Sequence, residues 1–396
     1  MTDTYRHLVI GRGIMGSAAA MHLAANSDSV AVLGPTEAMA ITDSAVPKAS
    51  HHDAGRNAHS LDEDPVWSEL GATSVARYRD IEKAAGIGFF DEIGYTRIHH
   101  DEAVVQRSAD HALRFSGKRP DVMSGDEANE RFPFFHFEPG ETIGYQPRDA
   151  GRINPRGYVD AMSTVASSNG AEIIDDHAVE MMVRDDGVQV HTAGGQTLLC
   201  ERVIVATGAY STFDNLLPIL LPLHVRGRTI VMVPVDDGTL SDLSGMPSVG
   251  CHPGDGRVRT YWHPPVTYPD GQKYLKIGGG PEGPQRISSL TVLNEWLRSD
   301  GDPEMADAYR AELHRMMPDL DLSDSVTAAC VTSETHSLRP YAEAICGGRV
   351  VVLTGGNGHG AKAADALGEI GASLMLEQDW PGQTTQSQFA LPDAAR

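Results

Sequence analysis

The fold is decided by the stretch Leu8-Val9-Ile10-Gly11-Arg12-Gly13-Ile14-Met15-Gly16, which leads directly into the helix-forming residues 17–25. Its order is a short apolar strand, a glycine-rich turn and a helix. Gly11 permits the tight turn, Gly13 lets a ligand approach the backbone, and Gly16 lets the helix pack close to the strand. A pyrophosphate would lie at the helix N-terminus, where unpaired N–H groups and the helix dipole favour negative charge. The stretch therefore predicts a dinucleotide-binding unit.

The second strand of this unit, Val30-Ala31-Val32-Leu33, lacks the acidic residue that commonly follows such a strand. That residue stands about 20 positions beyond the glycines and accepts hydrogen bonds from a ribose. Here the strand ends at Gly34-Pro35. Two alternatives remain: Glu37 reaches back from the following loop, or backbone and water hold the ribose.

The composition is that of a soluble globular protein with two or three domains. The chain has 396 residues, of which 41% are apolar, and can bury a large core. Its formal charge of −22 would repel a phosphate backbone, so nucleic acid is not expected as a partner. No apolar run approaches the roughly 18 residues of a membrane helix, and the first residues do not resemble a secretory signal. We therefore expect a cytoplasmic protein with no membrane partner.

Cysteine and histidine spacing gives no sign of a metal centre. The four cysteines lie far apart without a C-x-x-C pair, which argues against a zinc site or a disulfide framework. His51, His52 and Asp53 are neighbours, but no further clustered ligand accompanies them. No metal ion is expected.

Strand and helix patterns return twice further along the chain. In the middle, a helix over 155–168 precedes strand-like residues that end at 202–211; near the end, the strand 349–354 runs into a glycine-rich turn and a helix from about 363 to 377. Residues 89–145 and 223–324, which lie between these returns, are richer in aromatic, proline and polar residues. They indicate a second, sheet-containing domain inserted twice into the first.

Taken in order, these motifs resemble those of the D-amino-acid-oxidase superfamily of FAD enzymes (the DAO family), and most of all its monomeric sarcosine oxidase and N-methyltryptophan oxidase members. The resemblance runs from about Arg6 to Leu376. Besides the first glycine turn, it rests on three segments: Val203 to Ser211, Gly151 to Pro155, and Gly358-His359-Gly360-Ala361-Lys362.

The resemblance implies an α/β (α+β) fold, in which a discontinuous Rossmann-like FAD-binding domain carries an inserted antiparallel-sheet substrate domain. The FAD-binding domain would comprise residues 1–88, 146–222 and 325–380, and the substrate domain residues 89–145 and 223–324. Residues 381–396 are polar and read as a tail with little fold content.

The resemblance also implies which residues bind FAD. They come from both glycine turns, the loop at 50–56, the strand ending at 205 and the later strand that carries a cysteine. The candidates are Gly11, Gly13, Ile14, Met15, Gly16, His51, His52, Arg56, Ala206, Thr207, Gly208, Cys330, Gly356, Asn357, Gly358, His359, Gly360 and Lys362.

Lys276 and Lys362 match the two lysines of this family. Lys276 resembles the lysine that stands over the flavin and promotes reaction with O2, since a cation there stabilises developing negative charge. As a strand residue between Leu275 and Ile277, it fits a ligand face or solvent equally well. Lys362 resembles the lysine that binds the substrate carboxylate. A lysine in a first helical turn opposes the dipole, which suggests that a ligand or a partner compensates it.

The remaining pocket candidates depart in part from the family pattern. Arg56 falls on an arginine beside the flavin, and Tyr261 on a substrate-pocket tyrosine. Where sarcosine oxidase has a second arginine, this chain has His59, and a neutral imidazole cannot replace a bidentate guanidinium. Gly280 stands where a histidine is expected. These departures weaken the case for a simple N-methyl amino acid as substrate.

Two alignments compete around residue 330. In one, Cys330 falls close to the cysteine that carries the flavin covalently. In the other, Leu338-Arg339-Pro340 matches the family's Leu-Arg-Pro, so that Arg339 anchors the substrate carboxylate and Cys330 is a buried thiol. Both alternatives stay open.

The resemblance implies an FAD-dependent enzyme that oxidises the C–N bond of a secondary amine or N-substituted amino acid to an imine, with O2 reduced to H2O2. Its partners would be a small amine or amino acid and O2, and it would be a monomer or a small homo-oligomer. Three alternatives remain: a dehydrogenase of the same fold that uses another electron acceptor, a cyclic-imine-forming enzyme, and a non-catalytic flavin-binding subunit of a larger complex.

Overall fold

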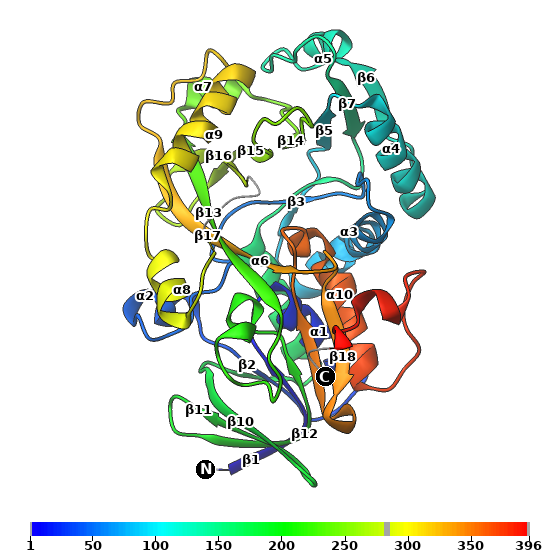
Figure 1. Cartoon of the computed structure of the whole chain (residues 1–396), viewed down its shortest axis with the longest axis vertical. Coiled ribbons are helices and arrows are strands. Elements are labelled where there is room, and N and C mark those ends of the chain that lie inside the picture. The colour runs from blue at the N-terminus through cyan, green and yellow to red at the C-terminus, as the bar shows by residue number, and fades with distance from the viewer. Residues whose placement is uncertain (1, 281–285, 394–396) are drawn as a thin grey trace.

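A computed structural model describes residues 2–280 and 286–393 of the chain (Figure 1). The first of its sheets holds β1 (Thr2–Ile10), β2 (Val30–Leu33), β9 (Glu172–Ile174), β10 (Ala178–Arg184), β11 (Gly187–Thr192), β12 (Thr197–Val205), β18 (Tyr341–Ile345) and β19 (Val350–Thr354). Strands β9, β2, β1, β12 and β19 are parallel in that spatial order. The β10–β11 hairpin pairs with the first half of β12, and β18 adds an antiparallel edge.

Helices α1 (Ile14–Ala24), α6 (Pro155–Ser168) and α10 (Gly360–Met375) pack on this sheet, and α3 (Pro65–Ala85) packs against α10. Small residues let the helices approach closely. A Cβ added at Gly368 of α10 would lie 2.5 Å from that of Ala18 on α1. The alanines of α1 and the valines of β1 and β2 belong to one buried apolar cluster, whose removal from water drives this packing.

The second sheet has the strand order β17 (Val326–Thr335), β13 (Leu223–Pro234), β16 (Lys273–Gly279), β15 (Thr260–Thr267), β14 (Ser248–Cys251), β5 (Tyr95–His99), β7 (Thr142–Gln146) and β6 (Asp121–Ser124). All neighbouring pairs are antiparallel except β14 and β5. Helix α9 (Pro303–Met316) covers β13 and β16, where its Tyr309 and Leu313 share an apolar cluster with Trp262. This sheet lies above the first in Figure 1.

A three-stranded sheet of β3 (Arg56–Ala58), β8 (Gly151–Ile153) and β4 (Phe90–Asp91) completes the strands of the described residues. The other helices are α2 (Glu37–Thr42), α4 (Glu102–Ser116), α5 (Gly125–Arg131), α7 (Asp237–Asp242), α8 (Leu290–Trp296) and three short 3₁₀ turns, Gly208–Thr212, Cys346–Gly348 and Gln386–Phe389. Within the described residues, none of the helices combines the length and the apolar character that crossing a membrane requires.

Several predicted elements are present at the predicted places: β2, α6, β19 and α10, which begins three residues earlier than expected. Strand β17 lies in the second sheet, although residues 325–380 were assigned to the FAD-binding domain, because it pairs with β13 along its whole length. The polar tail is also more ordered than its composition suggests, since Phe389 and Leu391 are buried. The domain boundaries stay a prediction.

Candidate functional site

A large cavity of about 1360 Å³ opens beyond the carboxyl ends of the parallel strands. One half is lined by the turns after β1, β2, β12 and β19, and the other half by residues of β5, β13, β15 and β17. Ligands of open α/β sheets bind at this edge. The volume exceeds the roughly 300–1,000 Å³ of sites for one small ligand, so a dinucleotide and a substrate both find room.

The glycine turn has the shape that a pyrophosphate needs. Gly11 has φ +103°, and a Cβ there would lie 2.5 Å from the carbonyl oxygen of Ala206. A Cβ at Gly16 would overlap the carbonyl oxygen of Gly11. Gly13 differs, because nothing lies within 4 Å of its Cβ position and the residue lines the cavity. Gly11 and Gly16 thus allow close packing, while Gly13 leaves an open cradle beside the start of α1.

Two helices point uncapped N-termini into the cavity. Neither Gly13, the N-cap of α1, nor His359, the N-cap of α10, offers a side-chain hydrogen bond, and neither helix has an acid in its first turn. The other eight α-helices of the described residues each have a side-chain cap. Since unsatisfied N–H groups at a helix start favour an anion, α1 and α10 fit a ligand with negative or carbonyl oxygens, as FAD has.

The end of β2 explains the missing ribose-binding acid. A Cβ at Gly34 would lie 2.5 Å from the backbone nitrogen of Arg12 and 3.0 Å from its Cα, so no larger residue fits. Glu37 accepts two hydrogen bonds of 2.6 Å from Arg156 and does not line the cavity. The structure therefore gives no support to the alternative in which Glu37 holds the ribose.

Most predicted site residues line this cavity. Those that do are Gly11, Gly13, Ile14, Met15, His51, Arg56, His59, Ala206, Thr207, Gly208, Tyr261, Cys330, Arg339, Gly356, Asn357, Gly358, His359, Gly360 and Lys362. Three do not: Gly16, which packs against the turn, His52 and Lys276. Burial lowers the pKa of His52 to about 4, so its imidazole is neutral near pH 7.

Lys276 is buried behind the cavity wall. Its side chain is 0% exposed, so the alternative that it points to solvent is wrong. The ammonium donates to Asp53 Oδ2 at 2.9 Å and to the carbonyl of Gly55, and lies 5.3 Å from the Tyr261 ring centre. Arg56 pairs with the same carboxylate of Asp53. Burial and the nearby Arg56 push the pKa of Lys276 well below its usual value.

Cys330 lines the cavity, as do Arg56 and Tyr261. The Arg56 Nη2 group lies 3.5 Å from Cys330 Sγ, and the Trp296 indole donates to the Cys330 carbonyl at 2.8 Å. Burial raises the pKa of Tyr261 to about 12, so its phenol stays protonated. Cys330 is therefore an accessible thiol beside a cation and a phenol.

The inner wall of the second half combines stacked rings with one buried ion pair. The His59 ring stacks on Tyr95 at 3.7 Å between centres, and His359 stacks on Trp67 at 5.0 Å. Burial, aided by the charge of Lys362, holds the pKa of His59 well below its usual value. His59 is therefore uncharged near pH 7.

Sequence reasoning expected a ligand or a partner for Lys362 but did not identify Asp62 as that partner. The Lys362 ammonium bonds to Asp62 Oδ2, and His359 Nδ1 lies 3.4 Å from the same oxygen. The neighbouring carboxylates of Glu63 and Asp64 pair with cations that also line the cavity: Arg97 at 3.3 Å and Arg339 at 2.6 Å. The three acids precede a proline and read only as a helix start; Asp64 does cap α3. No feature of the neighbouring sequence identifies the partners of these three acids.

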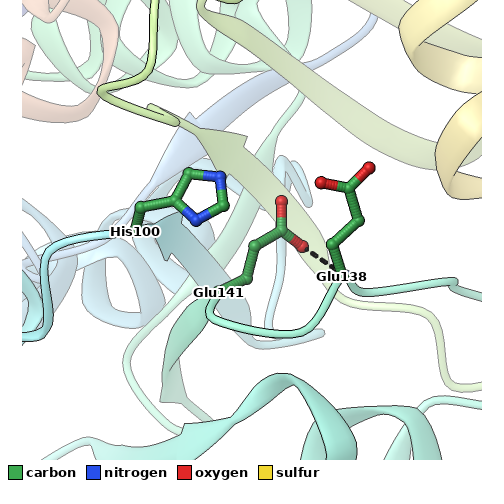
Figure 2. Close-up of side chains that lie close together, drawn as sticks. All are labelled: His100, Glu138 and Glu141. Atoms are coloured by element: carbon green, nitrogen blue, oxygen red, sulfur yellow. Dashed lines mark hydrogen bonds between the residues drawn. The ribbon is translucent and has the colours of Figure 1, made fainter.

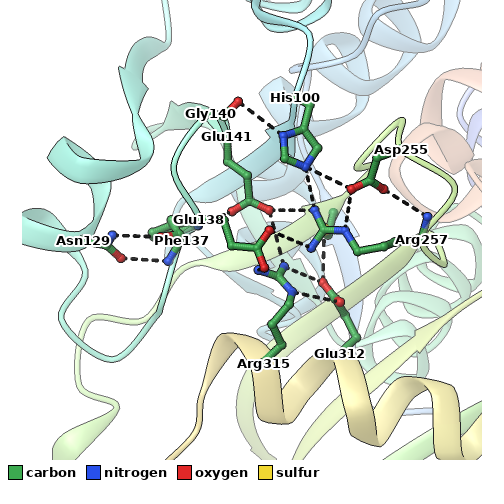
Figure 3. A network of polar contacts seen from close by, with 11 residues as sticks. His100, Asn129, Phe137, Glu138, Gly140, Glu141, Asp255, Arg257, Glu312 and Arg315 are labelled. Atoms are coloured by element: carbon green, nitrogen blue, oxygen red, sulfur yellow. Dashed lines mark hydrogen bonds and ion pairs between the residues drawn. The ribbon is translucent and has the colours of Figure 1, made fainter.

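A second polar cluster lies outside the cavity. His100, Glu138 and Glu141 bring their ligand atoms within 4.8 Å of one another, a spacing that could hold a metal ion (Figure 2). Two guanidinium groups share this space (Figure 3). Arg257 lies 3.0 Å from Glu141, and Arg315 lies 3.4 Å from Glu138. The carboxylates are thus charge-compensated, and the cluster joins the loops after β5, α5 and β14 to α9.

Comparison with known proteins agrees with this architecture. Residues 6–374 match the model of the FAD dependent oxidoreductase family, DAO. The chain is 26% identical to monomeric sarcosine oxidase of Streptomyces avermitilis (95% of this chain, 94% of the relative). It is 23% identical to N-methyl-L-tryptophan oxidase of Yersinia pestis (98% of each chain).

Solved structures show the same fold. The structure of NikD, an unusual amino acid oxidase essential for nikkomycin biosynthesis, matches with a TM-score of 0.75 at 19% identity over 98% of each chain. L-Proline dehydrogenase from P. horikoshii matches with a TM-score of 0.74 at 18% identity, over 95% of this chain and 94% of the other. The predictions of the fold class, of FAD dependence and of an oxidoreductase are confirmed. The chain belongs to the DAO family of FAD-dependent oxidoreductases.

Proposed function

We propose that this chain oxidises the C–N bond of a secondary amine or an N-substituted amino acid to an imine and delivers the electrons to O2. The amine loses a hydride equivalent from carbon and a proton from nitrogen, and O2 takes two electrons and two protons to give H2O2. Bound FAD supplies the hydride-accepting ring. The imine product then hydrolyses in water.

The observation that carries this proposal is the continuity of the cavity. The open cradle at Gly13 and the uncapped N-termini of α1 and α10 line the same space as Tyr261, His59 and Lys362. A dinucleotide held at the Gly13 cradle and the two helix N-termini would place its reactive ring towards Tyr261, His59 and Lys362. The similarity to oxidases of sarcosine and N-methyl-L-tryptophan supports an amine as the substrate.

The residues of the second half bind and orient the amine. Aromatic side chains of Tyr261, Trp67 and Tyr95 line the space and exclude water from it. Since the reacting amine must lose a proton, a neutral site favours its unprotonated form. His59 and His359 both have pKa values lowered by burial and supply uncharged imidazoles there.

We also propose that Cys330 attaches FAD covalently. Its thiol lines the cavity and lies beside Arg56. The positive charge of Arg56 stabilises negative charge on the group with which the thiol reacts. Acid precipitation tests this: yellow colour in the pellet of the wild type, and in the supernatant for Cys330→Ser, is expected. Colour in the wild-type supernatant would contradict attachment.

A dehydrogenase of the same fold is the second candidate, because Lys276 does not line the cavity and its charge is compensated by Asp53. A panel of secondary amines and N-methyl amino acids, assayed for peroxide in air and for dye reduction without air, separates the two. Peroxide formation at a rate equal to substrate loss supports the oxidase. Dye reduction without peroxide would favour the dehydrogenase.

A further inference from the structure

The loop before α3 neutralises three cations of the cavity, each with a different carboxylate. We call residues 62–64 the acidic loop. Its members pair one-to-one with side chains from α10, from β5 and from the segment between β17 and β18. The pairs are Asp62 with Lys362, Glu63 with Arg97, and Asp64 with Arg339.

The innermost of these pairs is buried on both sides. Asp62 and Lys362 are each 3% exposed and both line the cavity. Asp62 is also fixed in place, since its Oδ1 accepts the backbone N–H of Asp64 at 3.0 Å. A second carboxylate that approached Lys362 would meet the charge of Asp62 at close range in a buried site, where like charges repel strongly.

We propose that Asp62 takes the place of a substrate carboxylate at Lys362, so that the cavity selects an amine with no carboxylate next to its amino group. The geometry of the neighbouring walls fits such a substrate. The stacked pairs of His59 with Tyr95 and of Trp67 with His359 offer apolar ring faces beside a charge-balanced ion pair. Such surfaces favour an uncharged, apolar group.

This inference rests on the proposed function and narrows its substrate class. It also accounts for two departures from the family pattern. His59 is a neutral ring where a second carboxylate-binding arginine is expected, and Arg339, the alternative anchor, already has Asp64 as its partner at 2.6 Å. Each group expected to recognise a substrate carboxylate is thus uncharged or paired within the chain.

The first test uses the wild-type FAD-loaded protein and two ligands of equal shape, propionate and propionamide. Each is titrated, and its dissociation constant is taken from the change in the flavin spectrum or from competition with the amine for flavin reduction. We expect propionamide to bind at least as tightly as propionate. A clear preference for propionate would overturn the inference, and no variant is needed for that result.

Variants then assign the effect to Asp62. Asp62→Asn frees the ammonium of Lys362, and we expect propionate to bind at least about tenfold more tightly, equal to about 1.4 kcal/mol, with propionamide nearly unchanged. The double variant Asp62→Asn/Lys362→Met should lose this gain. Glu369→Gln is the control: it also removes a carboxylate paired with a cation, but neither Glu369 nor its partner Arg77 lines the cavity, and the ratio of the two affinities should stay within about twofold of wild type.

The outcomes separate this inference from the proposed function. If Asp62→Asn binds FAD and unfolds cooperatively but shows no gain for propionate, the role of Asp62 is refuted while amine oxidation stands. If no amine reduces the flavin of the wild type, the proposed function fails, although the spectral titrations still report which ligand binds. A gain that persists in the double variant would show that Lys362 is not the group that Asp62 masks.

Discussion

Replacing Gly13 with alanine is expected to weaken FAD binding and to leave the fold intact. Gly13 has φ −85°, which alanine adopts freely, and nothing lies within 4 Å of its Cβ position. The cost to the unliganded protein is therefore within about 1 kcal/mol, as for an ordinary N-cap change. The new methyl group would project into the open cradle at the start of α1. We expect the dissociation constant of FAD to rise at least about tenfold, or 1.4 kcal/mol.

Gly16→Ala provides the matched comparison, because its Cβ would overlap the carbonyl oxygen of Gly11 and lie 3.0 Å from the carbonyl carbon and 3.3 Å from Ala206 Cβ. Backbone atoms cannot rotate away, so the turn must shift. Overpacking of this kind costs about 1–3 kcal/mol or more. We expect a loss of stability without FAD for Gly16→Ala, and none of that size for Gly13→Ala.

Both variants are measured in a Cys330→Ser background, so that FAD binds reversibly. Quenching of flavin fluorescence on titration gives the dissociation constant, and thermal unfolding without FAD gives the relative stability. Wild-type FAD affinity in Gly13→Ala would refute the reasoning, because the pyrophosphate would then not lie against this turn. Equal destabilisation by the two variants would refute the contrast drawn from their contacts.

Three further changes test other parts of the structure. Arg257→Met should lower the free energy of unfolding by about 3 kcal/mol, because it leaves the buried carboxylate of Glu141 with weaker charge compensation. A chelator should not change the melting temperature of the wild type. A change in the melting temperature on chelation would indicate a metal ion at this cluster. Asp53→Asn should slow reoxidation of reduced FAD by O2, because burial already lowers the pKa of Lys276 and loss of the Asp53 carboxylate removes the anion that favours its charged form. Stopped-flow reoxidation at an unchanged or faster rate would speak against that. Burial raises the pKa of Asp62, but the cationic neighbours of Asp62 outweigh this effect and hold the pKa well below its usual value. The stabilising effect of the Asp62 carboxylate is therefore present above about pH 4 and lost on acidification. Denaturant unfolding between about pH 5 and about pH 3 should therefore show a steeper loss of stability for wild type than for Asp62→Asn, and equal slopes would contradict the assignment.

Local features made much of the fold predictable from sequence. The glycine turn after β1, the proline at the start of α6 and the apolar run of β19 each determine their own conformation through short-range contacts. The family resemblance predicted how these elements assemble. The place of strand β17 in the second sheet was not predictable, because its partner β13 lies about 100 residues earlier and no feature of its own residues identifies that partner.

The site was predictable where backbone shape determines it and less so where charges meet across the chain. The positions of Gly13, Tyr261 and Cys330 follow from motifs. Lys276 illustrates the limit, because alternation places it on one strand face but cannot show that Asp53 meets it there. The acidic loop has the same character: Asp62 and Lys362 are 300 positions apart, so only the folded chain brings them together.

The most direct test of the central claim is anaerobic reduction of the bound flavin by amines. FAD-loaded protein is mixed with secondary amines, with and without a neighbouring carboxylate, in the absence of any added acceptor, and the visible flavin absorbance is followed. We predict that at least one secondary amine bleaches the absorbance and that air restores it with formation of peroxide. A folded, FAD-loaded protein whose flavin is reduced by dithionite but by no amine would contradict the assignment of this chain as an amine-oxidising enzyme.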